Sequence, residues 1–253
     1  MTDATTLLVT EVFSAIQGEG ALVGERQVFL RLTGCNIRCA YCDQPEALEK
    51  RAGPCRLEQT PGRRDWCRRE SPLPVTEVAD AVGQLWRAVP HHSVSVTGGE
   101  PLLQARRLTA LFPLLTQQDQ SIYLETNGTL PSGLASVLEW VDHIGMDIKL
   151  DSVDHEAVDL ETHRRFLRAG TARHLFVKIV LGPATVPDEL DRAVAMVHGV
   201  APETEIFLQP VTPFADVAAA PSPGQVLELQ ERALRLHPRV RVVPQTHKLI
   251  GQL

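Results

Sequence analysis

The stretch QVFLRLTGCNIRCAYC, residues 27–42, decides the fold of this chain. Its first six residues form an apolar run bounded by Gly24 and Gly34, and such a run predicts a buried β-strand. Cys35, Cys39 and Cys42 follow the run directly. Because sites in parallel α/β folds lie at the carboxyl ends of the strands, this position predicts a functional loop.

Apolar runs of this kind recur along the chain, and segments with helical spacing separate them. The predicted strands are residues 27–32, 93–96, 121–124, 143–148, 175–180 and 205–208, with a short strand at 240–243. The predicted helices are residues 76–89, 101–115, 156–169, 189–197 and 223–236. Strands that alternate with helices indicate an α/β fold with a parallel sheet.

The number of strand–helix units indicates whether such a sheet forms a closed or a partial barrel. Six strand–helix units are fewer than the eight of a closed barrel. We therefore predict a partial (β/α)6 barrel, which is an open parallel sheet with outer helices. A doubly wound open sheet is the alternative, because periodicity does not report curvature.

The chain of residues 1–253 is predicted to form a single domain, since α/β barrels of this length are routinely undivided. Residues 47–74 interrupt the pattern with four prolines, six arginines and little periodicity. We predict an irregular insertion there. Residues 210–223 also carry four prolines and are predicted to form a loop.

Composition excludes several classes of protein. The net charge of −6, from 25 basic and 31 acidic residues, argues against a general nucleic-acid binder. No run of about 18 apolar residues predicts a membrane span, and the N-terminus has no signal-peptide pattern. The expected location is therefore the cytoplasm. There the five cysteines stay reduced, which favours metal-binding or catalytic roles over disulfides.

The three clustered cysteines form the pattern C-x-x-x-C-x-x-C. A four-iron cluster normally takes four thiolates, so three of them leave one iron open for a ligand. Three buried thiols are one alternative reading. A zinc site completed by His91 or His92 is another.

The cysteine loop resembles that of the radical S-adenosylmethionine (SAM) superfamily. Residues 11–20, EVFSAIQGEG, and residues 29–36, FLRLTGCN, resemble one family within it, 7-carboxy-7-deazaguanine synthase. Further motifs that match this family are TGGEP (97–101), LETNG (124–128), QPVT (209–212) and PQTHK (244–248). The resemblance covers residues 11–46 and 76–250, and it implies a partial barrel of the radical SAM type.

The resemblance implies one 4Fe–4S cluster, held by Cys35, Cys39 and Cys42, with SAM bound beside it. Carboxylate and amide groups at strand ends suit the hydroxyls of a ribose. An ordinary turn at Gly98-Gly99, and a solvated charge at Lys149, are the plainer readings. The implied SAM contacts are Gly98, Gly99, Glu100, Glu125, Thr126, Asn127, Asp147, Ile148, Lys149, Gln209, Pro210, Val211 and Thr212.

The implied reaction converts 6-carboxy-5,6,7,8-tetrahydropterin to 7-carboxy-7-deazaguanine and ammonia, an early step towards queuosine-type nucleosides. A 5′-deoxyadenosyl radical takes hydrogen from C6 of the substrate, the ring contracts, and SAM is regenerated. A structural ion pair for Arg31 and a surface position for His247 are the alternatives. The implied substrate contacts are Ile16, Gln17, Gly18, Glu19, Arg31, Thr97 and His247.

One position departs from the family pattern. Gln44 stands where the family commonly has a threonine whose hydroxyl meets Mg²⁺, so a requirement for Mg²⁺ stays open. Cys55 and Cys67, in the insertion, are predicted to be unbound thiols.

The expected partners are the pterin and an electron donor such as a flavodoxin or ferredoxin, without nucleic acid or membrane. A homodimer is left open. The competing functions are an enzyme that installs a glycyl radical on a partner protein, and a non-enzymatic iron–sulfur or zinc protein.

Overall fold

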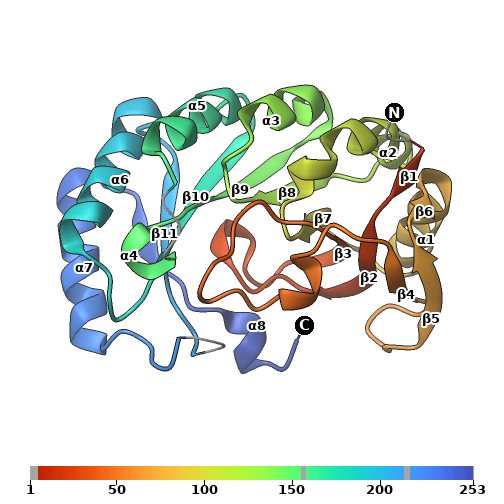
Figure 1. Ribbon diagram of the computed structural model, residues 1–253, viewed down its shortest axis with the longest axis horizontal. Coiled ribbons are helices and arrows are strands. Elements are labelled where there is room, and N and C mark those ends of the chain that lie inside the picture. The colour runs from red at the N-terminus through yellow and green to blue at the C-terminus, as the bar shows by residue number, and fades with distance from the viewer. Residues whose placement is uncertain (1–4, 155–157, 214–216, 253) are drawn as a thin grey trace.

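The computed structural model describes residues 5–154, 158–213 and 217–252. Its main sheet has ten strands in the order β12-β11-β10-β9-β8-β7-β3-β2-β4-β5 (Figure 1). Seven consecutive strands of this order, from β12 at one edge to β3, pair in parallel. They are β3 (Arg26–Leu32), β7 (Ser93–Gly98), β8 (Ile122–Thr126), β9 (His143–Ile148), β10 (His174–Leu181), β11 (Glu205–Pro210) and β12 (Val240–Val242).

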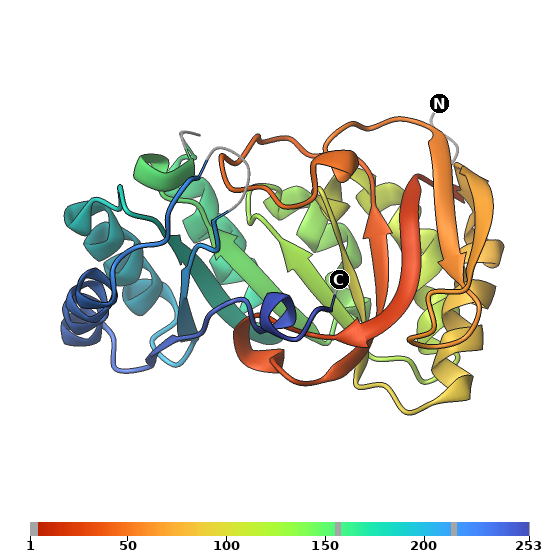
Figure 2. The ribbon, with the colours of Figure 1, turned by 90° about the horizontal axis from the view of Figure 1, so that it is seen from below.

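Helices connect the parallel strands and cover the convex face of the curved sheet (Figures 1 and 2). Each buries an apolar stripe; in α1, Val78, Val82 and Leu85 are fully buried at helical spacing. None of the described helices is both long and apolar enough to cross a bilayer. The connecting helices are α1 (Val75–Ala88), α2 (Ala105–Thr116), α3 (Pro131–Val137), α5 (Leu160–Gly170), α6 (Pro187–Val200) and α7 (Pro223–Leu236).

Short helical turns join these elements. They are η1 (Gly20–Leu22), η2 (Pro45–Ala47), η3 (Pro101–Gln104), η4 (Leu138–Trp140), α4 (Asp151–Asp154) and α8 (Thr246–Leu249). Helix α8 lies across the concave side of the sheet, where the loop after β3 also runs (Figure 2). The face of the sheet without connecting helices is therefore the one over which α8 and the cysteine loop lie.

Side chains alternate between the two faces of each strand, as the pleat requires. In β3, Leu30 and Leu32 pack into the core beneath the helices. Phe29 and Arg31 face the concave side and line a hollow there. Nearer the amino ends of β8, β10 and β11, Tyr123, Phe176 and Phe207 form a separate buried aromatic cluster.

The predicted architecture is confirmed as an open α/β sheet of the partial-barrel kind. A doubly wound sheet carries connecting helices on both faces, and here they lie on one face (Figure 2). Helix α3 was not predicted. The predicted start of a helix at residue 156 lies outside the described residues, and α5 begins at Leu160. A single domain over residues 1–253 stays a prediction.

The prediction of an irregular insertion at 47–74 is wrong in part. Strands β4 (Gly53–Glu58) and β5 (Trp66–Ser71) form an antiparallel hairpin there. It extends the sheet through β2 (Val9–Ile16), a strand that was also not predicted. Local patterning missed the hairpin because β5 is a charged edge strand. The short strands β1 (Thr6–Leu7) and β6 (Leu73–Pro74) pair separately.

Candidate active site at the open mouth of the barrel

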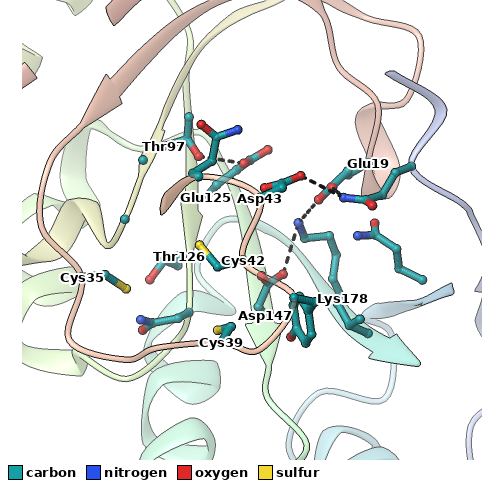
Figure 3. Close-up of a pocket in the computed structure, with 18 of the residues that line it drawn as sticks. Glu19, Cys35, Cys39, Cys42, Asp43, Thr97, Glu125, Thr126, Asp147 and Lys178 are labelled. Carbon is teal, nitrogen blue, oxygen red and sulfur yellow. Dashed lines mark hydrogen bonds and ion pairs between the residues drawn. The ribbon is translucent and has the colours of Figure 1, made fainter. Parts of the chain in front are cut away.

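The loop after β3 brings three thiols to one hollow at the carboxyl ends of the parallel strands (Figure 3). Cys35, Cys39 and Cys42 line this hollow, and none is in a disulfide. The Cys35 N–H donates to Leu48 O at 2.9 Å and the Gly34 N–H donates to the Ala47 carbonyl at 2.7 Å. These bonds fold the loop back on itself, so that its thiols face a common space.

The chemistry of these donors fits an iron–sulfur cluster. Each cluster iron takes its own thiolate, so the ligands surround the cluster and do not converge on a point. Among the described residues, no three His, Cys, Asp or Glu side chains converge on a single metal ion. Burial raises the pKa of the Cys35, Cys39 and Cys42 thiols, and a cationic group between them would hold them as thiolates.

The zinc alternative is wrong for the described residues. His91 bonds to Ser14 Oγ at 2.9 Å, and His92 bonds to Ser93 Oγ at 3.0 Å. Neither histidine lines the hollow that holds the thiols. Both stand at the opposite, amino end of β7, so neither completes a site with the cysteines.

The glycine pair after β7 lets main chain pack against the cysteine loop. Gly98 has φ of 132°, and a Cβ there would lie 2.1 Å from Leu32 O. A Cβ on Gly99 would lie 2.3 Å from Gly34 O. Because a side chain would clash at either position, the glycines leave bare main chain on the wall of the hollow.

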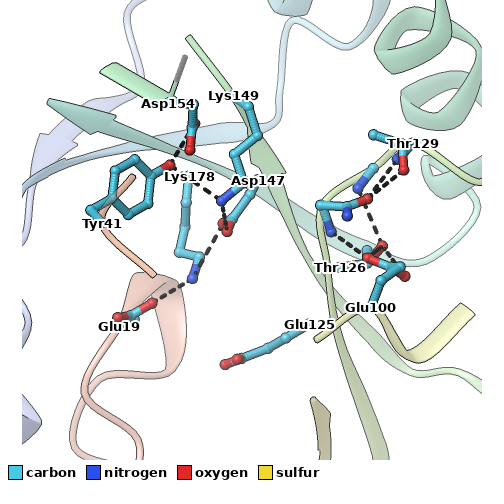
Figure 4. A network of polar contacts seen from close by, with 12 residues as sticks. Glu19, Tyr41, Glu100, Glu125, Thr126, Thr129, Asp147, Lys149, Asp154 and Lys178 are labelled. Atoms are coloured by element: carbon cyan, nitrogen blue, oxygen red, sulfur yellow. Dashed lines mark hydrogen bonds and ion pairs between the residues drawn. The ribbon is translucent and has the colours of Figure 1, made fainter. Parts of the chain in front are cut away.

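Glu100 supports this wall from below and does not line the hollow. Its carboxylate accepts hydrogen bonds from Leu102 N at 3.0 Å, Asn127 N at 2.8 Å and Thr126 Oγ1 at 3.0 Å (Figure 4). Burial raises the pKa of Glu100 to about 7, against the effect of these bonds. Glu100 therefore ties the loop after β7 to the end of β8.

Strand alternation sets which rim residues reach the hollow. Asp147 and Lys149 line it, whereas Ile148 between them packs into the core beneath the helices. Gln209 and Val211 line it, and the alternate residues of that segment do not. The side chains of Glu100, Ile148, Pro210 and Thr212 do not line the hollow, and their part in SAM binding stays a prediction.

A chain of charged side chains crosses the hollow (Figure 4). Lys178 Nζ pairs with Glu19 and lies 3.2 Å from Asp147 Oδ1. Lys149 Nζ lies 3.0 Å from Asp147 Oδ2 and 3.3 Å from the Tyr41 hydroxyl. Burial alone would raise the pKa of Glu19, but the Lys178 ammonium and its hydrogen bond lower it overall. Glu19 is therefore held as an anion, and Asp147 lies between two cations.

The C-terminal segment covers one side of the hollow. Thr246 N–H donates to Gly18 O at 3.0 Å, and Gln245 Nε2 donates to Glu19 Oε1 at 2.8 Å. A Cβ on Gly18 would lie 2.2 Å from His247 Nδ1, so glycine is what lets the two segments meet. This contact places His247 at the mouth of the hollow.

Arg31 lines the hollow and is also ion-paired. Its Nε lies 2.8 Å from Glu11 Oε1, and Arg56 Nη2 lies 2.6 Å from Glu11 Oε2. The structural ion pair that was the alternative interpretation of Arg31 is therefore present, and its contact with the substrate stays a prediction. One carboxylate shared by two guanidiniums leaves an excess of positive charge beside the hollow.

The hollow gathers most of the residues that sequence reasoning proposed. It joins the three cysteines with nine of the proposed SAM contacts and all seven proposed substrate contacts. The nine are Gly98, Gly99, Glu125, Thr126, Asn127, Asp147, Lys149, Gln209 and Val211. The seven are Ile16, Gln17, Gly18, Glu19, Arg31, Thr97 and His247.

Sequence reasoning missed several residues of the hollow, above all Lys178. Its signal was present: a lone lysine in the apolar run HLFVKIVL is costly to bury without a charged partner. Tyr41 and Asp43, inside the cysteine loop, were also missed. Tyr41 donates to Asp154 Oδ2 at 2.7 Å, and Asp43 Oδ2 lies 3.0 Å from Lys248 Nζ.

Comparison with protein families and curated sequences identifies close relatives. The model of the Radical SAM superfamily matches residues 30–201. A 7-carboxy-7-deazaguanine synthase of Geobacter sulfurreducens is 45% identical over 245 residues, 96% of either chain. One of Methanopyrus kandleri is 34% identical over 96% of this chain and 93% of the relative.

Solved structures show the same fold at lower identity. QueE from Escherichia coli matches with a TM-score of 0.58 and 18% identity, over 95% of this chain and 94% of that one. Streptococcus suis SuiB bound to precursor peptide SuiA matches with a TM-score of 0.61 and 13% identity, over 85% of this chain and 47% of that one. At these identities the likeness concerns the fold alone.

Proposed function

We infer the activity from the premise that this chain belongs to the 7-carboxy-7-deazaguanine synthase family of radical SAM enzymes. We propose that it converts 6-carboxy-5,6,7,8-tetrahydropterin to 7-carboxy-7-deazaguanine with loss of ammonia. The family assignment made from the motifs is confirmed. The observation that carries the proposed reaction is a single hollow lined by three thiols on one side and by Glu19 and Arg31 on another.

Membership of the radical SAM superfamily implies a 4Fe–4S cluster and SAM. We propose that Cys35, Cys39 and Cys42 hold the cluster, and that the nine rim residues named above hold SAM. When bound, the two groups supply an electron and the means to remove a hydrogen atom from the substrate. A flavodoxin or ferredoxin is the proposed electron donor.

The substrate carboxylate is proposed to bind at Arg31. The guanidinium uses its Nε for Glu11, which leaves its terminal nitrogens for a second carboxylate. The planar fork of arginine suits such a group. Glu11 also pairs with Arg56, so the charge of Glu11 stays balanced when a substrate carboxylate binds Arg31.

The aminopyrimidinone edge of the pterin is proposed to bind near Glu19 and Gln17. Glu19 is an anion that can accept from amino and ring N–H groups. The Gln17 amide donates to Glu125 Oε1 at 2.7 Å and to Gln27 Oε1 at 3.0 Å, which fixes its orientation. Lys178 holds Glu19 in place from the adjacent wall.

Water is proposed to be excluded by the segment that carries His247. Phe29, Val180 and Val211 supply apolar wall on the other sides of the hollow. An enclosed, largely dry site strengthens the charged contacts to the substrate and protects a reactive species from side reactions.

A Mg²⁺ ion, if used, is proposed to bind weakly. Gln44 lines the hollow beside Asp43, and its amide carbonyl is a hard oxygen of the kind that Mg²⁺ accepts. Its side chain is longer than that of threonine, which would shift the ion. We therefore propose a Mg²⁺ response that is weaker than a threonine would give.

Anaerobic incubation of the reconstituted protein with the carboxypterin, SAM and a reductant tests the proposed reaction. The expected products are 7-carboxy-7-deazaguanine and ammonia in equal amounts, identified by mass spectrometry and an ammonia assay. SAM cleavage that leaves the pterin unchanged would reject the proposed reaction while keeping the superfamily. Radical transfer to a protein partner would instead support the activating-enzyme alternative.

A further inference from the structure

A second hollow lies apart from the thiols, between the hairpin turn and the ends of β2 and β3. Arg26, Arg64 and Ser14 line it, together with Gly62 and Gln252. Its volume is about 310 Å³. Two arginines in one small hollow form a strongly positive site that the proposed reaction does not use.

Arg64 is held in an unfavourable state. Its φ is 60°, in the left-handed region, and its main-chain N–H donates to Glu58 Oε1 at 2.8 Å. Its Nη1 is buried and meets no hydrogen-bond acceptor among the described residues. Left-handed backbone and an unpaired buried donor each cost stability, and both are features of ligand clamps.

The neighbouring carboxylate forms no ion pair with either arginine. Glu58 is buried, and its two oxygens accept from the main-chain N–H groups of Arg64 and Ser14, each at 2.8 Å. Arg26 uses its Nε to donate to Ser14 Oγ at 3.0 Å, and its terminal nitrogens face no carboxylate within ion-pair distance in the described part of the chain. The Arg64 guanidinium lies over the Phe13 ring, 5.6 Å from its centroid, and Arg64 Nη1 and the terminal nitrogens of Arg26 are left to a ligand.

We propose that this hollow binds the phosphate group of a phosphorylated small molecule. Two guanidiniums supply two positive charges and planar pairs of donors, which match a phosphate dianion better than a singly charged carboxylate. The volume beyond the phosphate accommodates the rest of a small monoester. The site is independent of the proposed reaction, although Ile16 is a wall residue of both hollows.

Calorimetric titration of the reconstituted protein tests the site. The probes are inorganic phosphate and glycerol 3-phosphate, with acetate and chloride at matched ionic strength. Saturable binding of both phosphates, and none of acetate or chloride, is expected. No saturable binding of phosphate, acetate binding as tight as phosphate, or binding of free phosphate without the ester would overturn the proposal.

Three variants locate the binding. Arg64→Gly and Arg26→Ala should each weaken phosphate binding by about 10- to 100-fold, as loss of a charge-assisted hydrogen-bonding group predicts. Arg63→Ala is the matched control, because Arg63 is exposed next to Arg64 and does not line the hollow. Equal weakening in Arg63→Ala would show that net charge alone attracts the anion.

The Arg64→Gly variant also separates binding from folding. Glycine adopts a φ of 60° without strain, so this variant is expected to unfold at the same temperature as the native protein or a higher one. A variant that is fully folded and still binds phosphate with native affinity would refute the site.

Discussion

The two ends of the same parallel strands carry charge in different ways. Towards the carboxyl ends, Asp147 of β9 and Lys178 of β10 form part of an ion-paired chain inside the hollow (Figure 4). At the amino ends of the same strands, His143 and His174 stack with ring centroids 5.3 Å apart, and His174 is exposed. The aromatic cluster of Tyr123, Phe176 and Phe207 lies between the two layers.

This difference shows what converts a rim of polar residues into a site. Loops close over the carboxyl ends, so charges there lose water and must be paired, which fixes their positions. At the amino ends the imidazoles keep contact with solvent and need no such partners. We therefore expect substitutions at the first end to affect chemistry and stability strongly, and substitutions at the second end to affect them weakly.

The largest effect is expected from the thiols. Replacement of Cys35, Cys39 or Cys42 by alanine should remove the cluster absorbance and all SAM cleavage, because each iron needs its own thiolate. Iron content and visible absorbance after anaerobic reconstitution measure the cluster, and product analysis measures SAM cleavage. Cys55→Ala, in the hairpin, is the control that should keep the cluster. Activity retained in any of the three would contradict the assignment.

Lys178→Met should cause the largest loss of stability at the rim. Glu19 and Asp147 would lose their shared cation while their side chains stay only 16% and 22% exposed. Removal of one partner of a buried ion pair costs about 3–5 kcal/mol in stability. Because both carboxylates keep some contact with water, we expect a loss at the lower end of this range, about 3 kcal/mol. Urea unfolding at pH 7 measures the loss. Lys50→Met, at an exposed lysine, should stay within about 0.5 kcal/mol.

The pH dependence of stability tests the same contact. The pKa of Glu19 is lowered in the folded protein from 4.5, so its contribution is present above pH 4.5 and is lost as pH falls towards 2. Without Lys178, burial dominates and the pKa of Glu19 should no longer lie below 4.5. Lys178→Met should therefore lose less stability than the native protein between pH 6 and pH 3. An equal loss in both proteins would show that Lys178 does not lower the pKa of Glu19.

A smaller effect is expected for Gln44→Thr, which restores the residue common in the family. The half-saturating Mg²⁺ concentration should fall by about tenfold, equivalent to about 1.4 kcal/mol. Turnover of the carboxypterin is measured across a range of Mg²⁺ concentrations in both proteins. If Mg²⁺ strongly activates the native protein and Gln44→Thr does not change this response, then glutamine at this position has no effect on the use of Mg²⁺.

The smallest effect is expected at the amino ends, for His143→Phe. Burial and the nearby His92 and His174 lower the pKa of His143, and Asp142 opposes them. Stability is therefore lost as pH falls below the ordinary value of 6.5, and the variant should lose slightly less of it. Unfolding at pH 7.5 and pH 5.5 measures this. Turnover at pH 7.5 should equal that of the native protein. A large decrease would show that the amino ends of the strands are as important for the chemistry as the carboxyl ends.

Sequence patterns predicted the parallel strands well because each is a buried apolar run between breakers. They did not reveal β2, whose role is clear only from its antiparallel pairing with β3. Strand alternation places Arg31 on the same face as Phe29, and both line the hollow. It could not show that Glu11 pairs with Arg31, because Glu11 belongs to that unpredicted strand.

The site was predictable to the extent that it follows motifs and strand ends. The cysteine loop and the rim residues at 97–99, 125–127, 147 and 149 could be found because each directly ends a strand or follows one. Lys178 lies within a strand and carries no motif, so only its burial and its partners identify it. The positive hollow at Arg64 depends on a left-handed turn that no pattern predicted.

Equilibrium binding of the carboxypterin tests most directly whether the carboxyl rim takes the substrate. The dissociation constant is measured in the reconstituted native protein, in Arg31→Ala and in His174→Ala. Arg31→Ala should bind about 100-fold more weakly, as expected for loss of about 2–3 kcal/mol from a charge-assisted contact. Arg31→Lys should recover part of this, and His174→Ala should bind as the native protein does. Native affinity in a folded Arg31→Ala variant would contradict the account.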